Sequence, residues 1–187
     1  MDRRTKYTKK TIKDTLINLL SEKDINKITV SEICKIADIN RATFYRYYLD
    51  VYDLLNHIEQ DFEEELKNAY HPETNEENTV FFFSKAMLNV FLTNKELVKI
   101  LFTTNNNIYF LNTILGVAYE KCREKWQQDL PNLSEEDMEY AAVFIFNGAL
   151  GVVNFWVKND FDKDIDEVSE IIENLSYYGT RRFIYKK

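Results

Sequence analysis

Residues 41–48 read Arg-Ala-Thr-Phe-Tyr-Arg-Tyr-Tyr and place hydrogen-bonding side chains on one side of a predicted short helix. Phe44 and Tyr48 lie one helical turn apart, so they share the face that would pack against a core. The opposite face then carries three small or hydrogen-bonding side chains: Ala42, Thr43 and Arg46. Guanidinium and hydroxyl groups beside a small methyl match the acceptors and thymine methyl groups of the DNA major groove. This pattern therefore predicts base recognition on DNA.

A second helix and a tight turn must position this face. Four apolar residues with the spacing of a helix's inner side precede it: Val30, Ile33, Ile36 and Ala37. Thr29 or Ser31 is the expected N-cap of this helix. Asp38 tolerates the positive φ of a tight turn, and Asn40 is expected to cap the next helix, over about Arg41–Tyr48. Because paired short helices also occur in proteins that never touch DNA, the two-helix pattern alone leaves both interpretations open.

Three short stretches make the pattern more specific: Ala37-Asp38-Ile39-Asn40-Arg41, Thr43-Phe44-Tyr45 and Asp53-Leu54-Leu55. Over roughly residues 8–55 the chain resembles the TetR/AcrR family of transcriptional regulators. Asp38 stands where that family usually has glycine, and Val51 stands near a position that is often lysine, so the resemblance does not extend to the phosphate contact of that lysine. The resemblance implies contact with double-stranded DNA through eight residues: Thr29, Ser31, Arg41, Ala42, Thr43, Tyr45, Arg46 and Tyr47.

The resemblance also implies an all-α fold with two domains. Residues 1–52 would form a three-helix, helix-turn-helix DNA-binding domain, and residues 53–187 a helical bundle for effector binding and dimerisation. Composition agrees, since 4 Gly and 2 Pro in 187 residues favour long helices. Apolar periodicity predicts these helices: from about Thr8, Asp50–Tyr70, Thr79–Phe91, Asn94–Thr104, Ile108–Gln127, Glu135–Lys158 after an N-cap at Ser134, and Asp164 to about Tyr178.

Charge is distributed unevenly between the two predicted domains. Residues 1–50 hold 11 Lys and Arg against 7 Asp and Glu, a balance of +4, although the whole chain carries −7. Such asymmetry favours a basic region that meets DNA and an acidic remainder, although +4 also suits an ordinary solvated surface. Cations at the start of the chain would form a flexible arm along phosphates or a frayed terminus: Arg3, Arg4, Lys6, Lys9, Lys10 and Lys13.

Aromatic side chains crowd three successive predicted helices of the second domain. Pockets between bundle helices are lined in this way, which predicts a site for a small, apolar or aromatic effector. The candidate lining residues are Phe83, Phe91, Phe102, Tyr109, Phe110 and Tyr119. Plain core packing explains the same aromatics, and the sequence leaves that alternative open.

Two glycines interrupt a strongly apolar helix near residue 150. Each costs about 1 kcal/mol of helix stability relative to alanine, so we expect a reason for their presence. Four residues form a smooth stripe that suits a second copy of the chain: Gly148, Gly151, Val152 and Phe155. This segment and the helix after it also resemble the C-terminal dimerisation helices of some TetR-family members. The alternative is a helix buried within one monomer.

Catalysis and metal binding have little support in the sequence. His57 and His71 lack the spacing of a metal pair, and phosphate-binding glycine loops and nucleophile-elbow patterns are missing. Cys34 and Cys122 fit a reducing cytoplasm, and Cys34 is expected to be a buried core residue rather than a redox switch. The opening residues lack an apolar run, so we expect no signal sequence, and the sequence has no uninterrupted run of 18 apolar residues. We therefore expect a cytoplasmic non-enzyme with no cofactor, no metal and no membrane contact.

The predicted function is that of a homodimeric transcription regulator, most simply a repressor that a small-molecule effector releases from its operator. The alternative is a helical protein-interaction adaptor, or an activator that works through a protein partner. The effector's identity, the operator sequence and the regulated genes cannot be predicted from these residues.

Overall fold

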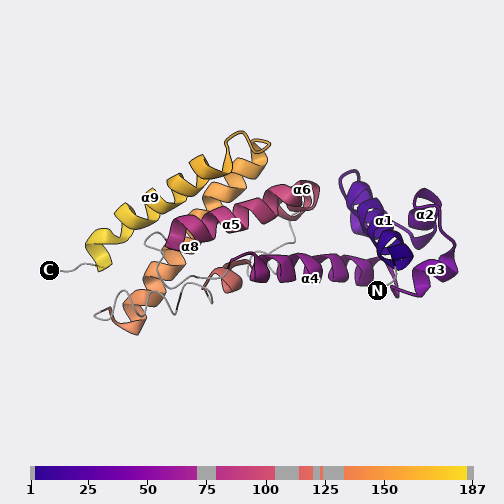
Figure 1. The fold of residues 1–187 in the computed structure, drawn as a ribbon, viewed down its shortest axis with the longest axis horizontal. Helices are drawn as coiled ribbons and strands as arrows, with labels where there is room; N and C mark the ends of the chain where they lie inside the picture. The colour runs from indigo at the N-terminus through magenta and orange to yellow at the C-terminus, as the bar shows by residue number, and fades with distance from the viewer. Residues whose placement is uncertain (1–2, 71–78, 104–113, 120–122, 124–132, 185–187) are drawn as a thin grey trace. The chain divides into compact units, whose positions relative to one another are not determined.

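Every regular element of the computed structural model is a helix, within the residues that it describes: 3–70, 79–103, 114–119, 123 and 133–184. Figure 1 shows them in chain order: α1 (Arg3–Leu20), the short 3-10 helix η1 (Ile25–Lys27), α2 (Val30–Ile36), α3 (Arg41–Tyr45), α4 (Val51–Ala69), α5 (Thr79–Thr93), α6 (Lys95–Thr103), α8 (Glu135–Lys158) and α9 (Ile165–Ile184). Residues 114–119 are also helical. The predicted all-α class is confirmed, whereas the stretch between the predicted helices Asp50–Tyr70 and Thr79–Phe91 lies outside the described residues.

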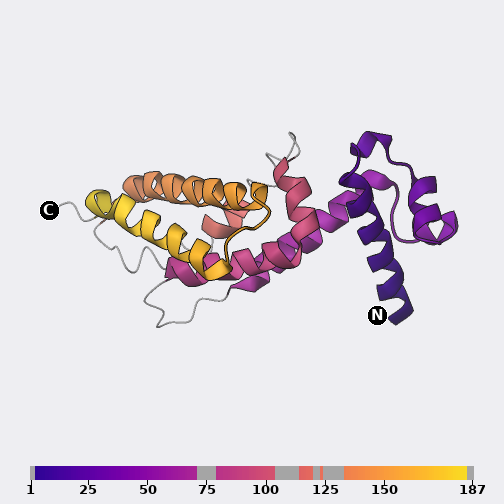
Figure 2. The ribbon, with the colours of Figure 1, turned by 90° about the horizontal axis from the view of Figure 1, so that it is seen from above.

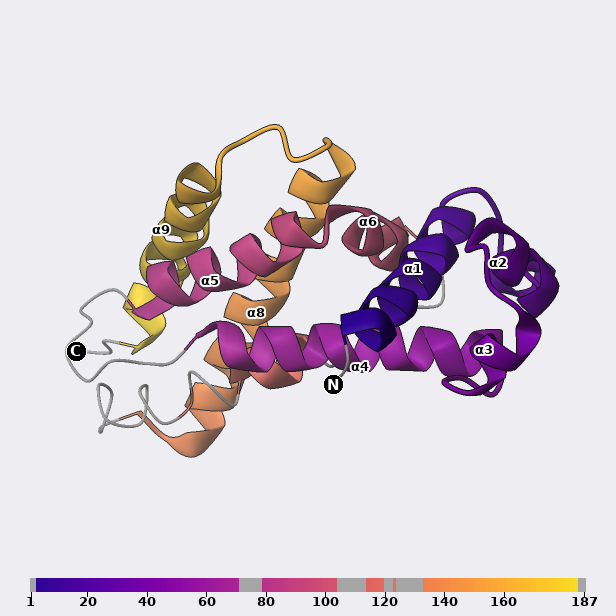
Figure 3. The same cartoon turned by 45° about the vertical axis from the view of Figure 1, so that its right-hand side comes forward.

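The chain forms two compact units, the first of which is Met1–Glu64. Within it α1 packs against α2, and α2 against α3 (Figure 3). Its core consists of apolar side chains from four helices, all 0% exposed: Ile12, Leu16, Ile33, Phe44 and Leu54. Because α4 crosses from this unit into the next, it belongs to both. The predicted division of function at residue 52 stays a prediction.

Two helices of the first unit differ from the expectation. α1 begins at Arg3, so the basic residues before Thr8 belong to a helix and the expected flexible arm is wrong. α3 ends at Tyr45 rather than near Tyr48. Its last turn tightens as the amides of Tyr47 and Tyr48 both donate to the Phe44 carbonyl, at 2.9 and 3.0 Å. The chain must turn there, because Asp50 accepts from the Asp53 amide at 2.8 Å and caps α4.

The second unit, Glu65–Lys187, is a helical bundle. α5 packs on α9, α9 on α8 and α6 on α8; Figure 2 shows α8 and α9 side by side, in orange and yellow. Its most deeply buried side chains include Leu88, Phe91, Val98 and Val168. α8 begins as predicted, because the Ser134 hydroxyl accepts from the Asp137 amide at 3.1 Å. Glu135, Glu136 and Asp137 in its first turn interact favourably with the helix dipole.

α8 is the one described helix that is long and apolar enough to cross a membrane by length and composition. The strict count of consecutive apolar residues missed it because Asn147 and Asn154 interrupt the run. This property is weak support for a membrane span, since the core helix of a soluble protein meets the same criterion. Met138, Ile145, Val153 and Trp156 of α8 are buried against the rest of the bundle.

The turn between α8 and α9 is fixed by an aromatic pair and by two lysines of α6. Asp160 and Phe161 both have positive φ, 58° and 60°. The rings of Phe161 and Trp156 meet edge to face at 4.8 Å, and the Trp156 indole donates to the Lys163 carbonyl at 2.8 Å. Lys95 and Lys99 contact the Asp160 carboxylate at 3.2 and 2.7 Å. These ion pairs connect the start of α6 to the turn.

Candidate nucleic-acid interface and effector cavity

The α2–turn–α3 segment has the local geometry that its residue types predict. Thr29 is the N-cap of α2, and its side chain accepts from the Glu32 amide at 3.2 Å. Asp38 takes the left-handed conformation with φ 51°, which closes the turn in place of glycine. The Asn40 carboxamide oxygen accepts from the backbone amide of Thr43 at 2.7 Å and from its hydroxyl at 2.9 Å. Local hydrogen bonds therefore fix where α3 begins.

The predicted DNA-contacting side chains divide into an exposed group and a partly covered one. Thr43 and Tyr47 are half-buried, and the rest are exposed: Thr29, Ser31, Arg41, Ala42, Tyr45 and Arg46. Phe44 and Tyr48 are buried beneath them, at 0% and 2% exposure. The buried pair fixes the rotation of the segment, so the exposed side chains point away from the core.

Two contacts arrange cations beside this exposed group. The Arg41 guanidinium donates to the Ser31 hydroxyl and so connects α3 to the first turn of α2. The Lys9 ammonium of α1 lies 5.4 Å from the centre of the Tyr47 ring. The sequence left the role of Lys9 open between an arm along phosphates and a frayed terminus, and only the packing of α1 shows that it lies beside Tyr47.

Two further exposed apolar side chains were missed. Leu49, between α3 and α4, is 79% exposed, and Tyr52 in the first turn of α4 is 54% exposed. The signal was present in the periodicity of α4, because buried Val51 and Leu54 place Tyr52 on the outer side. Both side chains are exposed in the stretch that follows α3, which makes them candidates for the same interface.

Cys34 lies beneath this surface in α2 and is 5% exposed. Burial raises the pKa of its thiol, and nearby Arg41 lowers it by a smaller amount. Since the thiolate is the reactive form, a buried thiol with a raised pKa suits the expected core residue better than a redox switch.

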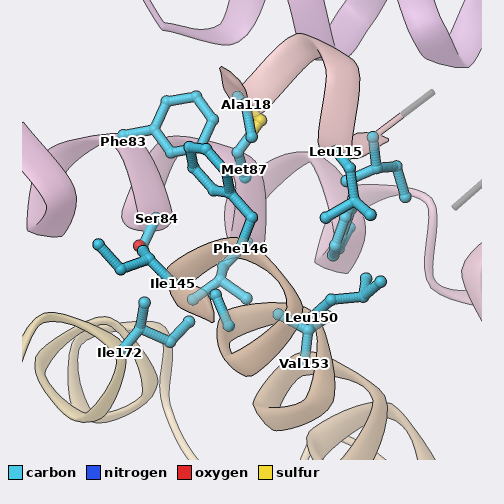
Figure 4. A pocket seen from close by; sticks show the side chains of 14 residues that line it. Phe83, Ser84, Met87, Leu115, Ala118, Ile145, Phe146, Leu150, Val153 and Ile172 are labelled. Atoms are coloured by element: carbon cyan, nitrogen blue, oxygen red, sulfur yellow. The ribbon is translucent and has the colours of Figure 1, made fainter. Parts of the chain in front are cut away.

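An apolar cavity of about 70 Å³ lies within the second unit. Its described wall comes from α5, residues 114–119, α8 and Ile172 of α9: Phe83, Ser84, Met87, Leu88, Phe91, Ile114, Leu115, Ala118, Ile145, Phe146, Ala149, Leu150, Val153 and Ile172. Figure 4 shows Phe83, Met87 and Ala118 on one side and Ile145, Leu150 and Val153 on the other. The i, i+4, i+8 spacing of Ile145, Ala149 and Val153 was the sequence signal for the α8 wall.

The predicted effector-binding aromatics occupy two layers around this cavity. Phe83 and Phe91 line it. Phe102 lies behind Phe91, with ring centres 5.9 Å apart, and Tyr119 lies behind the lining residue Phe146, at 6.4 Å. Tyr109 and Phe110 are outside the described residues. Contact of any of these residues with an effector stays a prediction.

The predicted dimerisation stripe lies on the outer side of α8. Gly148 and Gly151 are exposed, Val152 is half-buried, and Phe155 is 69% exposed. A Cβ added at either glycine would meet no atom within 4 Å, so packing among the described residues does not require a glycine there. A groove of about 400 Å³ runs between this side of α8 and α9. Ile145, Ala149 and Ile172 line both the groove and the interior cavity.

A sequence profile described as a transcriptional regulator C-terminal region, TetR_C_8, matches residues 78–178. Over 58 residues the chain is 34% identical to an HTH-type transcriptional regulator of Bacillus subtilis, YxbF. That match spans 31% of this chain and only 15% of YxbF. Together with the profile match, the capped helix-turn-helix and the helical bundle place the chain in the class of helix-turn-helix transcription regulators.

Solved structures show the same fold. A TetR-family regulator of Syntrophomonas wolfei covers 97% of this chain and 99% of its own length, with TM-score 0.73 at 15% identity. The dihydroxyacetone kinase operon activator DhaS covers 93% and 96%, with TM-score 0.68 at 18% identity. The complex of SmeT with triclosan covers 92% and 91%, with TM-score 0.67 at 15% identity. With the profile match over more than half its length, the chain belongs to the TetR family of transcriptional regulators.

Proposed function

We propose that two copies of this chain bind DNA together and regulate transcription, each placing α3 in a major groove. The observation that carries the proposal is the exposed side of the capped α2–α3 segment, where Arg41 and Arg46 lie with Ser31 and Thr43 above a fully buried Phe44. Guanidinium groups pair with guanine, and the hydroxyls hydrogen-bond bases or phosphates. A two-fold pair of such heads fits a near-palindromic operator with half-sites about 34 Å apart.

DNA binding is tested with the full chain on a pool of random-sequence duplexes at two salt concentrations. We expect retention at low salt that falls steeply as salt rises, because cations released from phosphates drive binding. Sequencing the retained fraction gives the operator. The affinity of Arg46→Ala for this operator is then compared with that of Lys158→Ala, a control that removes an exposed cation of the second unit. No retention of any duplex at low salt would overturn DNA binding.

The outer side of α8 and α9 supports pairing of two copies. Apolar side chains there are largely exposed, including Val143 at 63%, Phe144 at 60% and Leu175 at 60%. Phe144 and Leu175 both line the groove between α8 and α9. An exposed apolar surface of this kind marks a protein contact, and glycines that one copy does not need suit close helix approach in a pair. Sedimentation equilibrium should give a dimer at micromolar concentration. A monomer there would remove the dimer from the proposal.

We propose repression with release by an effector in the α5–α8 cavity as the regulatory output. SmeT, which shares the fold, has been solved with triclosan, a small molecule. Ile145, Ala149 and Ile172 line both the cavity and the groove, so an effector that displaces them would also change the pairing surface. An effector acts only through different affinities for two arrangements, so operator DNA must weaken effector binding by the same factor, about 5–150-fold. Mass spectrometry of extracts from purified protein would identify a bound effector, and calorimetry with and without operator would measure this factor.

Activation through a protein partner is the second candidate, because DhaS, with the same fold, is an operon activator. In vitro transcription from the selected operator distinguishes the two outputs by the sign of the change. In either case we propose a cytoplasmic protein without catalytic activity, since the family consists of transcription regulators. A cofactor that copurifies in stoichiometric amount would contradict that part of the proposal.

A further inference from the structure

The wall of the interior cavity carries almost no polar chemistry. Of the described side chains that line it, Ser84 supplies the one oxygen, drawn in red in Figure 4, and Met87 supplies the one sulfur. The others end in carbon. On α5 the nearest charge, Lys85, is engaged with Asp166 of α9 at 2.5 Å, and these side chains are 40% and 60% exposed. The described wall therefore offers no counter-charge to an ion.

The aromatic part of the wall is packed from behind by a second layer of rings. Phe83 meets Tyr70 edge to face at 5.5 Å, in the same way that Phe91 and Phe146 are backed by Phe102 and Tyr119. Edge-to-face pairs favour fixed ring orientations, so these three rings form a preformed apolar wall. Met87 is different, because its unbranched thioether side chain changes rotamer at little cost. The wall thus combines fixed rings with one adjustable side chain.

Cavity size limits the ligand. A dry apolar cavity of about 150 Å³ holds a benzene molecule. The cavity here, at about 70 Å³, must expand even for a single ring, and the flexible Met87 is placed to allow this. A fused-ring or long-chain molecule would require the helices themselves to separate.

We propose that the effector of this protein is a small uncharged molecule, with one ring or a short alkyl group and at most one hydroxyl, and that the cavity rejects carboxylates of the same size. The proposal rests on the proposed effector site and adds its chemistry. Transfer of a neutral ring into this wall removes apolar surface from water. Transfer of a carboxylate into it strips the charge of its hydration without supplying a partner.

The test uses three probes of similar size on the full-length protein: toluene, benzyl alcohol and benzoate. Calorimetry and ligand-detected NMR should show toluene and benzyl alcohol binding, with benzoate at least about 100-fold weaker. Ser84→Ala should weaken the binding of benzyl alcohol about 5-fold and leave the affinity for toluene unchanged, because only the alcohol can hydrogen-bond to the Ser84 hydroxyl. Benzoate binding as tight as toluene binding overturns the proposal, as does a wild-type cavity that binds none of the three.

A cavity-filling variant locates the bound probe. Ala118→Leu adds three carbons to a buried wall residue and should weaken toluene at least about 10-fold. Gly116→Leu is the matched control in the same helical segment, because a Cβ there meets no atom within 4 Å. Equal toluene affinity in both variants would place the probe outside the cavity and overturn the proposal. If Ala118→Leu loses its helical circular dichroism, the comparison of probes on the wild type still decides.

Failure of this inference and failure of the proposed function give different results. Operator retention is measured on the same preparation, and it involves the first unit. Retention without toluene binding overturns the ligand chemistry alone. Toluene binding without retention of any duplex supports the cavity chemistry and overturns the DNA-binding regulator.

Discussion

Both units expose large apolar side chains, but in different electrostatic settings. In the first unit the exposed Tyr45 lies between Arg41 and Arg46 in sequence, and Tyr7 follows Lys6. In the second, residues 140–157 contain no charged residue at all, although Phe144 and Phe155 are 60% and 69% exposed. Aromatics among cations suit a polyanion, which attracts charge and offers bases and sugars to contact. Aromatics without charge suit a second apolar protein surface. Exposure alone therefore does not identify a partner; the neighbouring charges do.

The sharpest separation of the two surfaces is their response to salt. DNA binding through six to ten phosphate contacts should weaken by about 10³–10⁵ between 50 and 200 mM salt. Pairing through the uncharged α8 surface should change little, because burial of apolar area involves no counterion release. Fluorescence anisotropy on the selected operator and sedimentation at the same salt concentrations give the two values. A dimer that dissociates in parallel with DNA release would contradict the contrast between the two units.

A charge placed on the α8 surface should abolish pairing. In Gly151→Arg each copy would bury an unpartnered guanidinium in the pair, at a cost of about 3–5 kcal/mol. The monomer should fold normally, since added atoms at Gly151 meet open space and arginine favours helix over glycine. We expect monomers in sedimentation together with unchanged or higher thermal stability. Gly116→Arg is the control, and a dimer as strong as the wild type would show that pairing uses another surface.

The corresponding change in the first unit is Arg46→Ala. If Arg46 reads a base, its loss should cost about 1–3 kcal/mol on the operator and relax sequence preference at one position. Tyr45→Phe should instead lower the affinity for all duplexes alike, if its hydroxyl meets a phosphate. Both variants should leave the dimer intact. Equal operator affinity in the wild type and in both variants would contradict the assigned face.

The α2–α3 segment was predictable because its signals are local. The caps at Thr29 and Asn40 and the turn at Asp38 involve residues within three or four positions of one another, so residue type fixes the geometry. The predicted end of α3 was wrong, because apolar spacing does not report where a helix stops. The apolar spacing of Phe44 and Tyr48 predicted a helix through Tyr48. In the structure α3 ends earlier, because the chain turns before α4, whose start at Val51 is set by the Asp50 cap.

The cavity was less predictable because its wall brings together distant parts of the chain. Aromatic density indicated α5 and residues 114–119, but Phe102 and Tyr119 stand one layer behind the wall. Ile172 of α9 closes the cavity from far along the chain, and its apolar side chain is indistinguishable from any core residue in the sequence. Packing partners at such separations cannot be read from helical periodicity, which reports only the side of a helix.

Removing the N-cap of α3 should lower both the stability of the first unit and its DNA affinity, each by a smaller amount than the changes above. Asn40→Ala deletes the acceptor for two hydrogen bonds from Thr43, and loss of an N-cap costs about 1 kcal/mol. Urea unfolding should detect this change in the first unit, and DNA affinity should fall by a similar amount because α3 is short and depends on its cap. Asn40→Asp retains an acceptor and is the matched control. If Asn40→Ala and Asn40→Asp unfold at the same urea concentration, the cap contributes nothing.

The smallest expected effect tests how the second unit uses its cations. Hydrogen bonds from Lys99 and Lys95 hold the pKa of Asp160 below its unfolded value of 3.8. A carboxyl with a lowered folded pKa contributes stability above its unfolded pKa, and this contribution is lost as pH falls through the folded value. Asp160→Asn should therefore lower the melting temperature slightly at pH 6; the difference should shrink as pH falls below 3.8 and vanish below the lowered folded pKa. Asparagine also tolerates positive φ, so the variant tests charge rather than backbone strain. Because the pair is exposed, 0.5 M salt should shrink the difference at pH 6. A melting difference that is the same at pH 6 and pH 3 would mean that Asp160 acts through the turn geometry, not through its charge.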